Sequence, residues 1–201
     1  MHDPLRATPW LRAASEAAVR RASGTTTFTL GASAPVEFAA GGFALEGGEK
    51  VALYQSLSEE LDALLRGELD PVANAANAAA AIFHSLPELN WAGFYFLQGQ
   101  ELVLGPFQGK PACVRILLGK GVCGTAAAER RSLLVADVHQ FPGHIACDAD
   151  SRSELVVPLL TASSVLGVLD LDSPRPGRFD VIDQAGCEAI AAMLVQHKLS
   201  H

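Results

Sequence analysis

The sequence predicts an α+β domain in which helices flank a largely antiparallel sheet. Apolar residues recur at helical spacing at 49–66 and again near the C-terminus, and short strand-like apolar runs, separated by turn residues, fill the middle. The 201 residues, 49% of them hydrophobic, suffice for one well-buried domain but hardly for two. We therefore expect one domain, residues 49–199, preceded by an accessory extension, residues 1–48.

Three long helices follow from spacing and capping signals. Apolar residues recur three and four positions apart in 49–66, which predicts an amphipathic helix. Asp70 followed by Pro71 is typical of a helix start, so a second helix should follow at once. Asp180 can cap a last helix that runs toward the C-terminus.

Short apolar runs with period-two alternation predict the sheet. We expect strands at residues 91–97, 101–104, 112–118, 132–138, 154–160 and 164–172. A short helix at residues 124–131 and a loop at residues 139–153 interrupt them.

The first 48 residues differ in character from the rest. Residues 1–23 carry four arginines and two acidic side chains, as an organelle transit segment or a solvated terminal arm would. Residues 24–48 are mostly small, with two charged side chains, Glu37 and Glu46, and a strand is expected at 25–30. Because no apolar run approaches the roughly 20 residues that span a bilayer and no secretory signal is evident, we expect a soluble intracellular protein.

Charge and cysteine usage narrow the function classes. A formal net charge of −7 leaves no basic stripe for nucleic acid and favours a small cationic or zwitterionic ligand. The four cysteines include no C-x-x-C pair, so in a reducing compartment they are either core residues or reactive thiols. Cys187 falls on the apolar stripe of the last helix and is expected to be structural.

Two strands present candidate pocket residues. Period-two geometry places Trp91 and Tyr95 on one face of their strand, where they form either a pocket wall or a second buried face. Asp170 and Asp172 likewise share a face, and Glu154 begins the preceding strand. Such neighbouring carboxyl groups raise at least one pKa, which would suit an acid catalyst or an ammonium site.

A glycine-rich turn, GKGVCG at residues 119–124, matches the dinucleotide fingerprint G-x-G-x-x-G. The chain does not alternate strands and helices as a doubly wound sheet does, which argues against that interpretation. The following helix N-terminus could instead hold the carboxylate of an amino acid and lower the pKa of Cys123.

His139, His144 and Cys147 are spaced as metal ligands can be, but no fourth ligand is evident nearby, so we expect no metal site. Proximity of His144 to Cys147 could instead favour the thiolate.

Five stretches carry specific motifs: NWAGFYFL, LVLGPFQGKPACVRI, GKGVCGTAA, DVHQFPGHIACDADSRSE and GVLDLDS. They closely resemble the free methionine-R-sulfoxide reductases, a family with a GAF fold. The resemblance covers residues 49–198 and includes all three family cysteines. It implies a single GAF domain with a central antiparallel sheet of about six strands flanked by helices. The first 48 residues depart from the bacterial-type pattern.

The resemblance also implies residue roles. Cys147 corresponds to the nucleophile, Cys113 to the main resolving thiol and Cys123 to a second thiol able to join a disulfide. The remaining correspondences are to the substrate pocket: Trp91, Tyr95, Glu154, Asp170 and Asp172.

The implied activity is reduction of free L-methionine (R)-S-oxide, not the peptide-bound form, through a redox-active disulfide that thioredoxin recycles. No cofactor is implied, and the setting would be the oxidative stress response of a cytoplasmic homodimer. The acidic residues would bind the substrate ammonium group, and either the helix N-terminus or Arg115 would bind the substrate carboxylate.

Two other classes stay open. One is a GAF-type sensor that binds a cyclic nucleotide, or uses its cysteines as a redox switch, without turnover. The other is a dinucleotide-dependent oxidoreductase. Steady turnover of free methionine sulfoxide with thioredoxin would distinguish the reductase from both.

Overall fold

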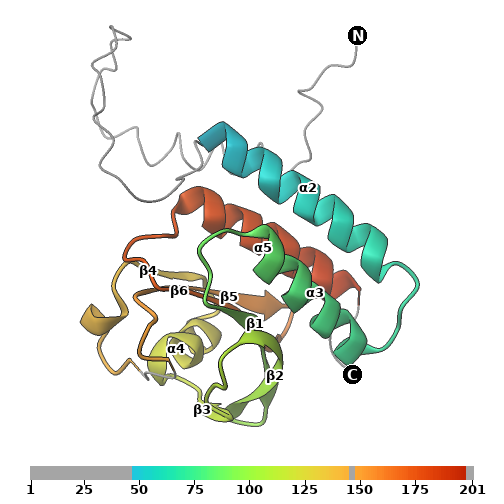
Figure 1. Ribbon diagram of the computed structural model, residues 1–201. Coiled ribbons are helices and arrows are strands. Elements are labelled where there is room, and N and C mark those ends of the chain that lie inside the picture. Colours follow the sequence, from blue (N-terminus) through green and yellow to red (C-terminus); the bar gives the residue numbers. More distant parts are fainter. Residues whose placement is uncertain (1–46, 145–147, 198–201) are drawn as a thin grey trace, which may run out of the picture.

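The computed structural model describes residues 47–144 and 148–197 of the chain. The strand expected at residues 25–30 and the expected nucleophile Cys147 lie outside these ranges. Within them, one six-stranded sheet carries long helices on one face and a short helix on the other (Figure 1). The predicted α+β class is therefore confirmed.

The sheet has the strand order β3–β2–β1–β6–β5–β4, and every neighbouring pair is antiparallel. Its strands are β1 (Trp91–Gln98), β2 (Glu101–Gly109), β3 (Arg115–Leu117), β4 (Leu133–Val135), β5 (Ser153–Leu160) and β6 (Val165–Ser173). A doubly wound dinucleotide-binding sheet is mostly parallel. This topology argues against the dinucleotide interpretation of residues 119–124.

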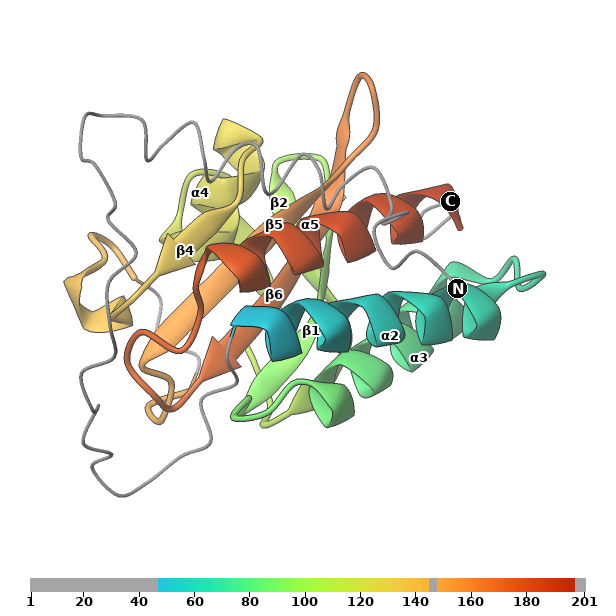
Figure 2. The same ribbon diagram turned by 90° about the horizontal axis from the view of Figure 1, so that it is seen from above.

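The three long helices form the layer above the sheet, as Figures 1 and 2 show. Helices α3 (Pro71–Ser85) and α5 (Val181–Gln196) lie on the strands, and α2 (Gly47–Leu65) packs on both helices. The side chains of Asp70 and Asp180 cap α3 and α5 by accepting hydrogen bonds from backbone N–H groups, as predicted. No helix in the described part of the chain is long and apolar enough to cross a membrane.

Period-two alternation in the central strands produces two separate cores. On the helical side, Leu169 and Leu171 of β6 pack with Phe94 of β1 beneath α3 and α5. On the opposite side, Tyr95 and Val168 pack with residues of α4 (Gly121–Glu129). Strands β1, β5 and β6 therefore each contribute one face to an apolar core beneath the helices and the other face to the side that carries α4.

Element boundaries near α4 differ from the predictions. Strand β2 continues to Gly109, five residues beyond the expected end, whereas β3 keeps only three of its expected seven residues. Helix α4 begins at Gly121, three residues early. A Cβ at Gly124 would lie 2.3 Å from the Leu117 carbonyl oxygen, so a glycine is needed where this helix turn meets the end of β3.

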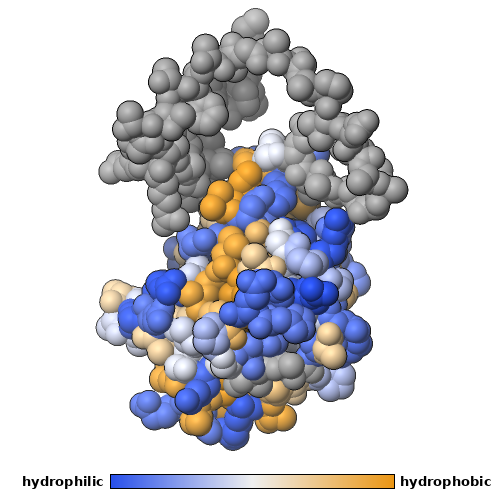
Figure 3. All heavy atoms as spheres, turned by 90° about the vertical axis from the view of Figure 1, so that its left-hand side faces the viewer, coloured by the Kyte–Doolittle hydropathy of each residue, from blue (hydrophilic) through white to orange (hydrophobic). Residues whose placement is uncertain are grey.

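The molecular side that carries the β4 edge shows a narrow apolar band among hydrophilic side chains (Figure 3). Strand β4 pairs with β5 only as far as Val156. Beyond it, Val157 and Leu160 of β5 line a groove together with Leu134 and with Ala192 of α5. The edge of β5 past β4 thus borders an open groove.

A buried ionic network joins α2 to α5. Asp183, 1% exposed, accepts hydrogen bonds from Lys50 Nζ at 2.6 Å, Tyr54 Oη at 3.0 Å and an Arg178 guanidinium nitrogen at 3.0 Å. Gly186 lies one turn further along α5, where a Cβ would lie 2.3 Å from the Tyr54 ring. The ion pairs of Asp183 and the close approach at Gly186 therefore both fix the position of α2 against α5.

We expect Asp183→Ala to lower the free energy of unfolding by about 3–5 kcal/mol, because Lys50 and Arg178 would keep buried charges without their shared partner. Urea titration followed by circular dichroism measures the loss. Arg66→Ala is the control, since it removes the exposed ion pair with Asp62 and should barely move the midpoint. Equal losses in the two variants would contradict the role given to Asp183.

Candidate functional site

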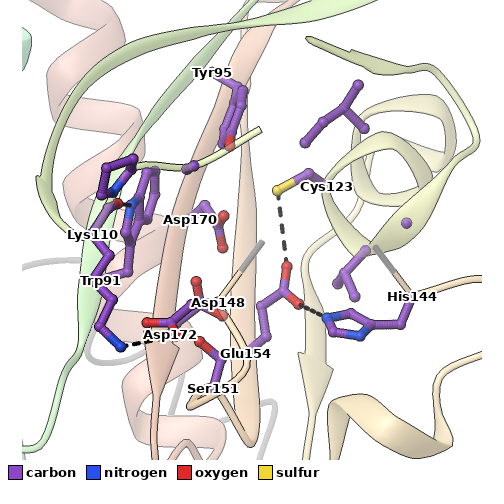
Figure 4. Close-up of a pocket in the computed structure, with 15 residues that line it drawn as sticks. Trp91, Tyr95, Lys110, Cys123, His144, Asp148, Ser151, Glu154, Asp170 and Asp172 are labelled. Atoms are coloured by element: carbon purple, nitrogen blue, oxygen red, sulfur yellow. Dashed lines mark hydrogen bonds and ion pairs between the residues drawn. The ribbon is translucent and has the colours of Figure 1, made fainter. Parts of the chain in front are cut away.

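The candidate site is a pocket between α4 and the lower face of β1, β6 and β5, with loops on its rim (Figure 4). It gathers aromatic, acidic and sulfur-bearing side chains from distant parts of the sequence. Its polar and aromatic lining residues are Trp91, Tyr95, Lys110, Cys123, His144, Asp148, Ser151, Glu154, Asp170 and Asp172. All five predicted substrate-binding residues and Cys123 are therefore brought together.

Trp91 and Tyr95 form the expected aromatic wall. Their rings stack with centroids 5.9 Å apart, and Phe107 of β2 continues the stack at 5.4 Å from Trp91. The indole Nε1 of Trp91 donates to the Lys110 carbonyl oxygen at 3.2 Å, which fixes the ring plane. Both residues are nearly buried and belong to the second core, and they also line the pocket, so they form a pocket wall as part of a buried face.

Three carboxyl groups converge opposite this wall, and strand pairing explains why. Glu154 of β5 lies directly across from Asp172 of β6, and Asp170 lies two residues earlier on the same face. Burial, the largest cause, raises the pKa of Asp170 to about 7. Burial and then the charge on Asp170 raise the pKa of Glu154 and Asp172 well above their usual range. The cluster thus retains protons near neutral pH, as predicted.

Cys123 lies among these acids, and its predicted thiol acidity is wrong. The thiol is 4% exposed, with Sγ 3.9 Å from Glu154 Oε1. Burial, followed by the charges on Asp170 and Glu154, raises the pKa of Cys123 well above its usual value. A helix N-terminus contributes only about 0.3–1 kcal/mol, which desolvation and neighbouring carboxylates outweigh here.

The other cysteines separate into different environments. Cys113 is half-buried in the loop after β2, beside the second core, and is disulfide-bonded. Cys187 is 1% exposed in the helical core, where its Sγ lies 3.7 Å from Tyr54 Oη, which confirms its structural role. Burial raises the pKa of the Cys187 thiol to about 12. Cys147, the expected nucleophile, follows His144 by three residues in the sequence and is not described.

Sequence reasoning missed the polar rim of the pocket. Asp148 accepts hydrogen bonds from Lys110 Nζ and Asn90 Nδ2, each at 3.2 Å, and Asn90 also donates to Ser151. Lys110 forms a second ion pair with Asp150. The only signal was that Lys110 lies in the same motif as Cys113, and Asp148 directly after Cys147.

The expected substrate contact at Arg115 is also wrong. Its guanidinium pairs with Glu101 at 3.0 Å, on the exposed outer part of β3. Arg115 does not line the pocket, whereas Lys110 does. Alternation along β3 explains this, because Ile116 is the residue that β3 directs to the pocket.

The two histidines of the loop have different partners. His139 is 59% exposed in its side chain and pairs with Asp137 at 3.0 Å. His144 lines the pocket, with Nε2 3.9 Å from Glu154 Oε2. Burial, and then the charge on His139, lower the pKa of His144, so its ring is neutral near pH 7. The described histidines therefore give no support to the metal alternative.

The raised pKa of Asp170 makes stability depend on pH. Because the folded state holds this proton more tightly than the unfolded chain, the contribution is complete below about pH 4 and lost as the pH rises toward 7. At pH 8 we expect the free energy of unfolding of Asp170→Asn, measured by urea titration, to exceed that of wild type by roughly 2–4 kcal/mol. At pH 4 the two proteins should differ little. The exposed Glu60→Gln is the control. A gap that is independent of pH would exclude this cause.

Comparisons with known proteins agree with this geometry. The GAF domain model matches residues 60–197. The free methionine-R-sulfoxide reductase of Escherichia coli is 49% identical over 145 residues, covering 72% of this chain and 88% of that protein. The reduced Staphylococcus aureus enzyme is 49% identical with a TM-score of 0.70, covering 72% and 94% of the two chains.

A third relative bears directly on the pocket. The free methionine-R-sulfoxide reductase of Neisseria meningitidis, solved in complex with its substrate, is 39% identical with a TM-score of 0.72 and covers 81% of this chain and 94% of its own. The GAF domain match, residues 60–197, includes the strands and the helix that build the site. This chain belongs to the GAF-domain family of free methionine-R-sulfoxide reductases.

Proposed function

We propose that this protein reduces free L-methionine (R)-S-oxide to L-methionine. The observation that carries the proposal is a pocket in which an aromatic wall faces three proton-holding carboxyl groups. It occurs in a chain that is 49% identical, over 145 residues, to a free methionine-R-sulfoxide reductase. Aromatic rings suit the thioether and methyl end of the substrate, and carboxyl groups suit its sulfoxide oxygen and ammonium.

The carboxyl cluster supplies the proton that the reaction needs. A thiolate attacks the sulfoxide sulfur and the sulfoxide oxygen takes up one proton. The hydroxyl group then passes to the cysteine sulfur as the transient S–S bond and the substrate S–O bond break, which leaves methionine and a cysteine sulfenic acid. At neutral pH an ordinary carboxyl group has no proton to give, whereas the buried Glu154 and Asp170 have raised pKa values. The protonated acid can therefore donate to the oxygen as the thiolate attacks.

We assign the nucleophilic step to Cys147 and resolution to Cys113. The resolving thiol attacks the sulfenic acid sulfur, which releases water and forms a disulfide. Cys123 is poorly suited to the nucleophilic attack or to the resolving step, because its buried thiol resists ionisation. It contributes to the pocket floor and supplies a third thiol for later exchange.

Both charges of a free amino acid have partners in this pocket. The ammonium fits among Glu154, Asp172 and Asp148, whereas Lys110 is the permanently charged cation of the described lining and suits the carboxylate. A residue within a peptide carries neither charge. Selection of the free amino acid follows from this arrangement.

The sensor alternative fits the pocket less well. A cyclic nucleotide brings a phosphate, and four carboxyl groups line this pocket, with Lys110 as the single lysine or arginine of the described lining. Placing a phosphate beside buried acids is costly. A redox switch without turnover would not need proton-holding acids next to an aromatic wall.

Regeneration completes the proposed cycle. Thioredoxin is the expected reductant of the disulfide, and a cytoplasmic homodimer acting in the oxidative stress response is the expected setting. Each part is a separate proposal, because the pocket chemistry is the same for any dithiol reductant.

Activity with two substrates tests the proposal. With thioredoxin and its reductase, the protein should turn over free L-methionine (R)-S-oxide continuously. N-acetylation removes the ammonium, so catalytic efficiency should fall roughly tenfold to more than a hundredfold, the equivalent of about 1.5–3 kcal/mol. Asp172→Asn should slow the free substrate while changing the acetylated one little. No turnover would remove the proposed function, and equal rates for the two substrates would remove the ammonium site.

Single-turnover chemistry separates the two cysteine roles. Cys147→Ser should form no methionine from one equivalent of sulfoxide, whereas Cys113→Ser should form up to one equivalent and then stop, since its sulfenic acid lacks the main resolving thiol. Quenched-flow chromatography measures methionine per protein. Near-equal yields in the two variants would overturn the assignment. Cys187→Ala, in the helical core, is the matched cysteine control.

A further inference from the structure

Cys123, Glu154 and Asp170 form a compact set of metal-ligating atoms. Each contributes one ligand atom, and the three atoms lie within 4.8 Å of one another. They come from three elements, α4, β5 and β6, and all three side chains face the pocket (Figure 4). Their exposed fractions are only 4%, 6% and 6%. The set is therefore held by the fold and not by surface side chains that happen to meet.

Asp170 adds an independent indication of a ligand. Its Oδ1 is buried and, among the described residues, has no hydrogen-bond partner, although the residue is 6% exposed and lines the pocket. A buried carboxylate oxygen without a partner costs free energy that a bound cation or donor would recover. The Asp170 carboxyl group lies beside the Cys123 thiol and the Glu154 carboxyl group in the pocket (Figure 4).

We propose that these three residues bind a Zn²⁺ ion, through the Cys123 thiolate and one oxygen each of Glu154 and Asp170. Zinc accepts sulfur and carboxylate ligands together and is usually four-coordinate, so the fourth position opens toward the pocket for water. Calcium and magnesium take oxygen ligands and would not use the thiolate.

The geometry needs only small adjustments. Ideal zinc bond lengths in a tetrahedron place sulfur and oxygen ligands about 3.6 Å apart, and Cys123 Sγ lies 3.9 Å from Glu154 Oε1. His144 Nε2 lies 3.9 Å from the other Glu154 oxygen, where it can orient that carboxylate from outside the metal shell. Binding replaces the thiol proton, and any carboxyl protons, by the metal, and these protons pass to solvent.

Zinc at this site would compete with the substrate. The ion occupies the acids that the proposed mechanism uses to protonate the sulfoxide, so metal and substrate exclude each other. Competition rests on the proposed function, whereas the metal site rests on the geometry alone. The two are therefore tested by separate measurements.

The metal site is tested with Co²⁺ and Zn²⁺ on the full-length protein, reduced with a phosphine that is then removed. Cobalt should bind one per chain with a thiolate-to-cobalt charge-transfer band, and zinc should abolish the band. Cys123→Ser should lose the band, and Cys123→Ser and Glu154→Gln should each weaken zinc binding by at least about a hundredfold, since loss of mere outer-shell partners costs tenfold to a hundredfold. Cys187→Ala should bind as wild type.

Three outcomes would overturn the metal site: no thiolate-to-cobalt band in wild type, a band that survives in Cys123→Ser, or a band lost in Cys113→Ser instead. If Cys123→Ser does not fold, Glu154→Gln still tests the metal site through its weakened zinc binding. Calorimetric competition between zinc and free methionine sulfoxide then tests exclusion. Simultaneous binding of both would refute competition while leaving the metal site standing, and neither result depends on turnover.

Discussion

The desolvation of three carboxyl groups on one face of the paired strands β5 and β6 is the constraint on which the rest of this structure depends. The register of the two strands places Glu154 opposite Asp172. Asp170 lies two residues before Asp172 on the same face of β6. The alternation that turns these acids toward α4 turns Leu155 and Leu171 into the helical core. A shift of one residue would bury the acids among leucines. The same pairing therefore secures both the fold and the chemistry.

Burial that keeps protons on the acids also keeps one on Cys123. The thiol and the carboxyl groups share a dry site, so each negative charge there disfavours the others. A nucleophile needs a different environment, partly exposed to solvent and not buried among carboxyl groups. Acid and nucleophile must therefore come from different elements. An attacking thiol outside the sheet meets this requirement, in agreement with the proposed role of Cys147, which precedes β5 in the sequence.

Local patterns predicted the elements and the faces of the strands, because period and capping are properties of neighbouring residues. Trp91 and Tyr95 were placed correctly for that reason. The rim residues Lys110 and Asp148 could not be found this way, since their contact joins loops 38 residues apart. The pKa of Cys123 was predicted in the wrong direction because burial by β5 and β6 is a long-range effect. Local sequence showed only the helix N-terminus.

The two cores divide stability and chemistry between the faces of one sheet. The helical face combines a purely apolar cluster with the fully paired Asp183 network, so its buried charges are compensated. The pocket face holds three buried acids, and Asp170 Oδ1 has no hydrogen-bond partner among the described residues, so this face disfavours folding at neutral pH. A cation, whether a proton, an ammonium group or a metal, relieves that cost only when it is bound. The least favourable part of the fold is thus the part most able to bind a ligand selectively.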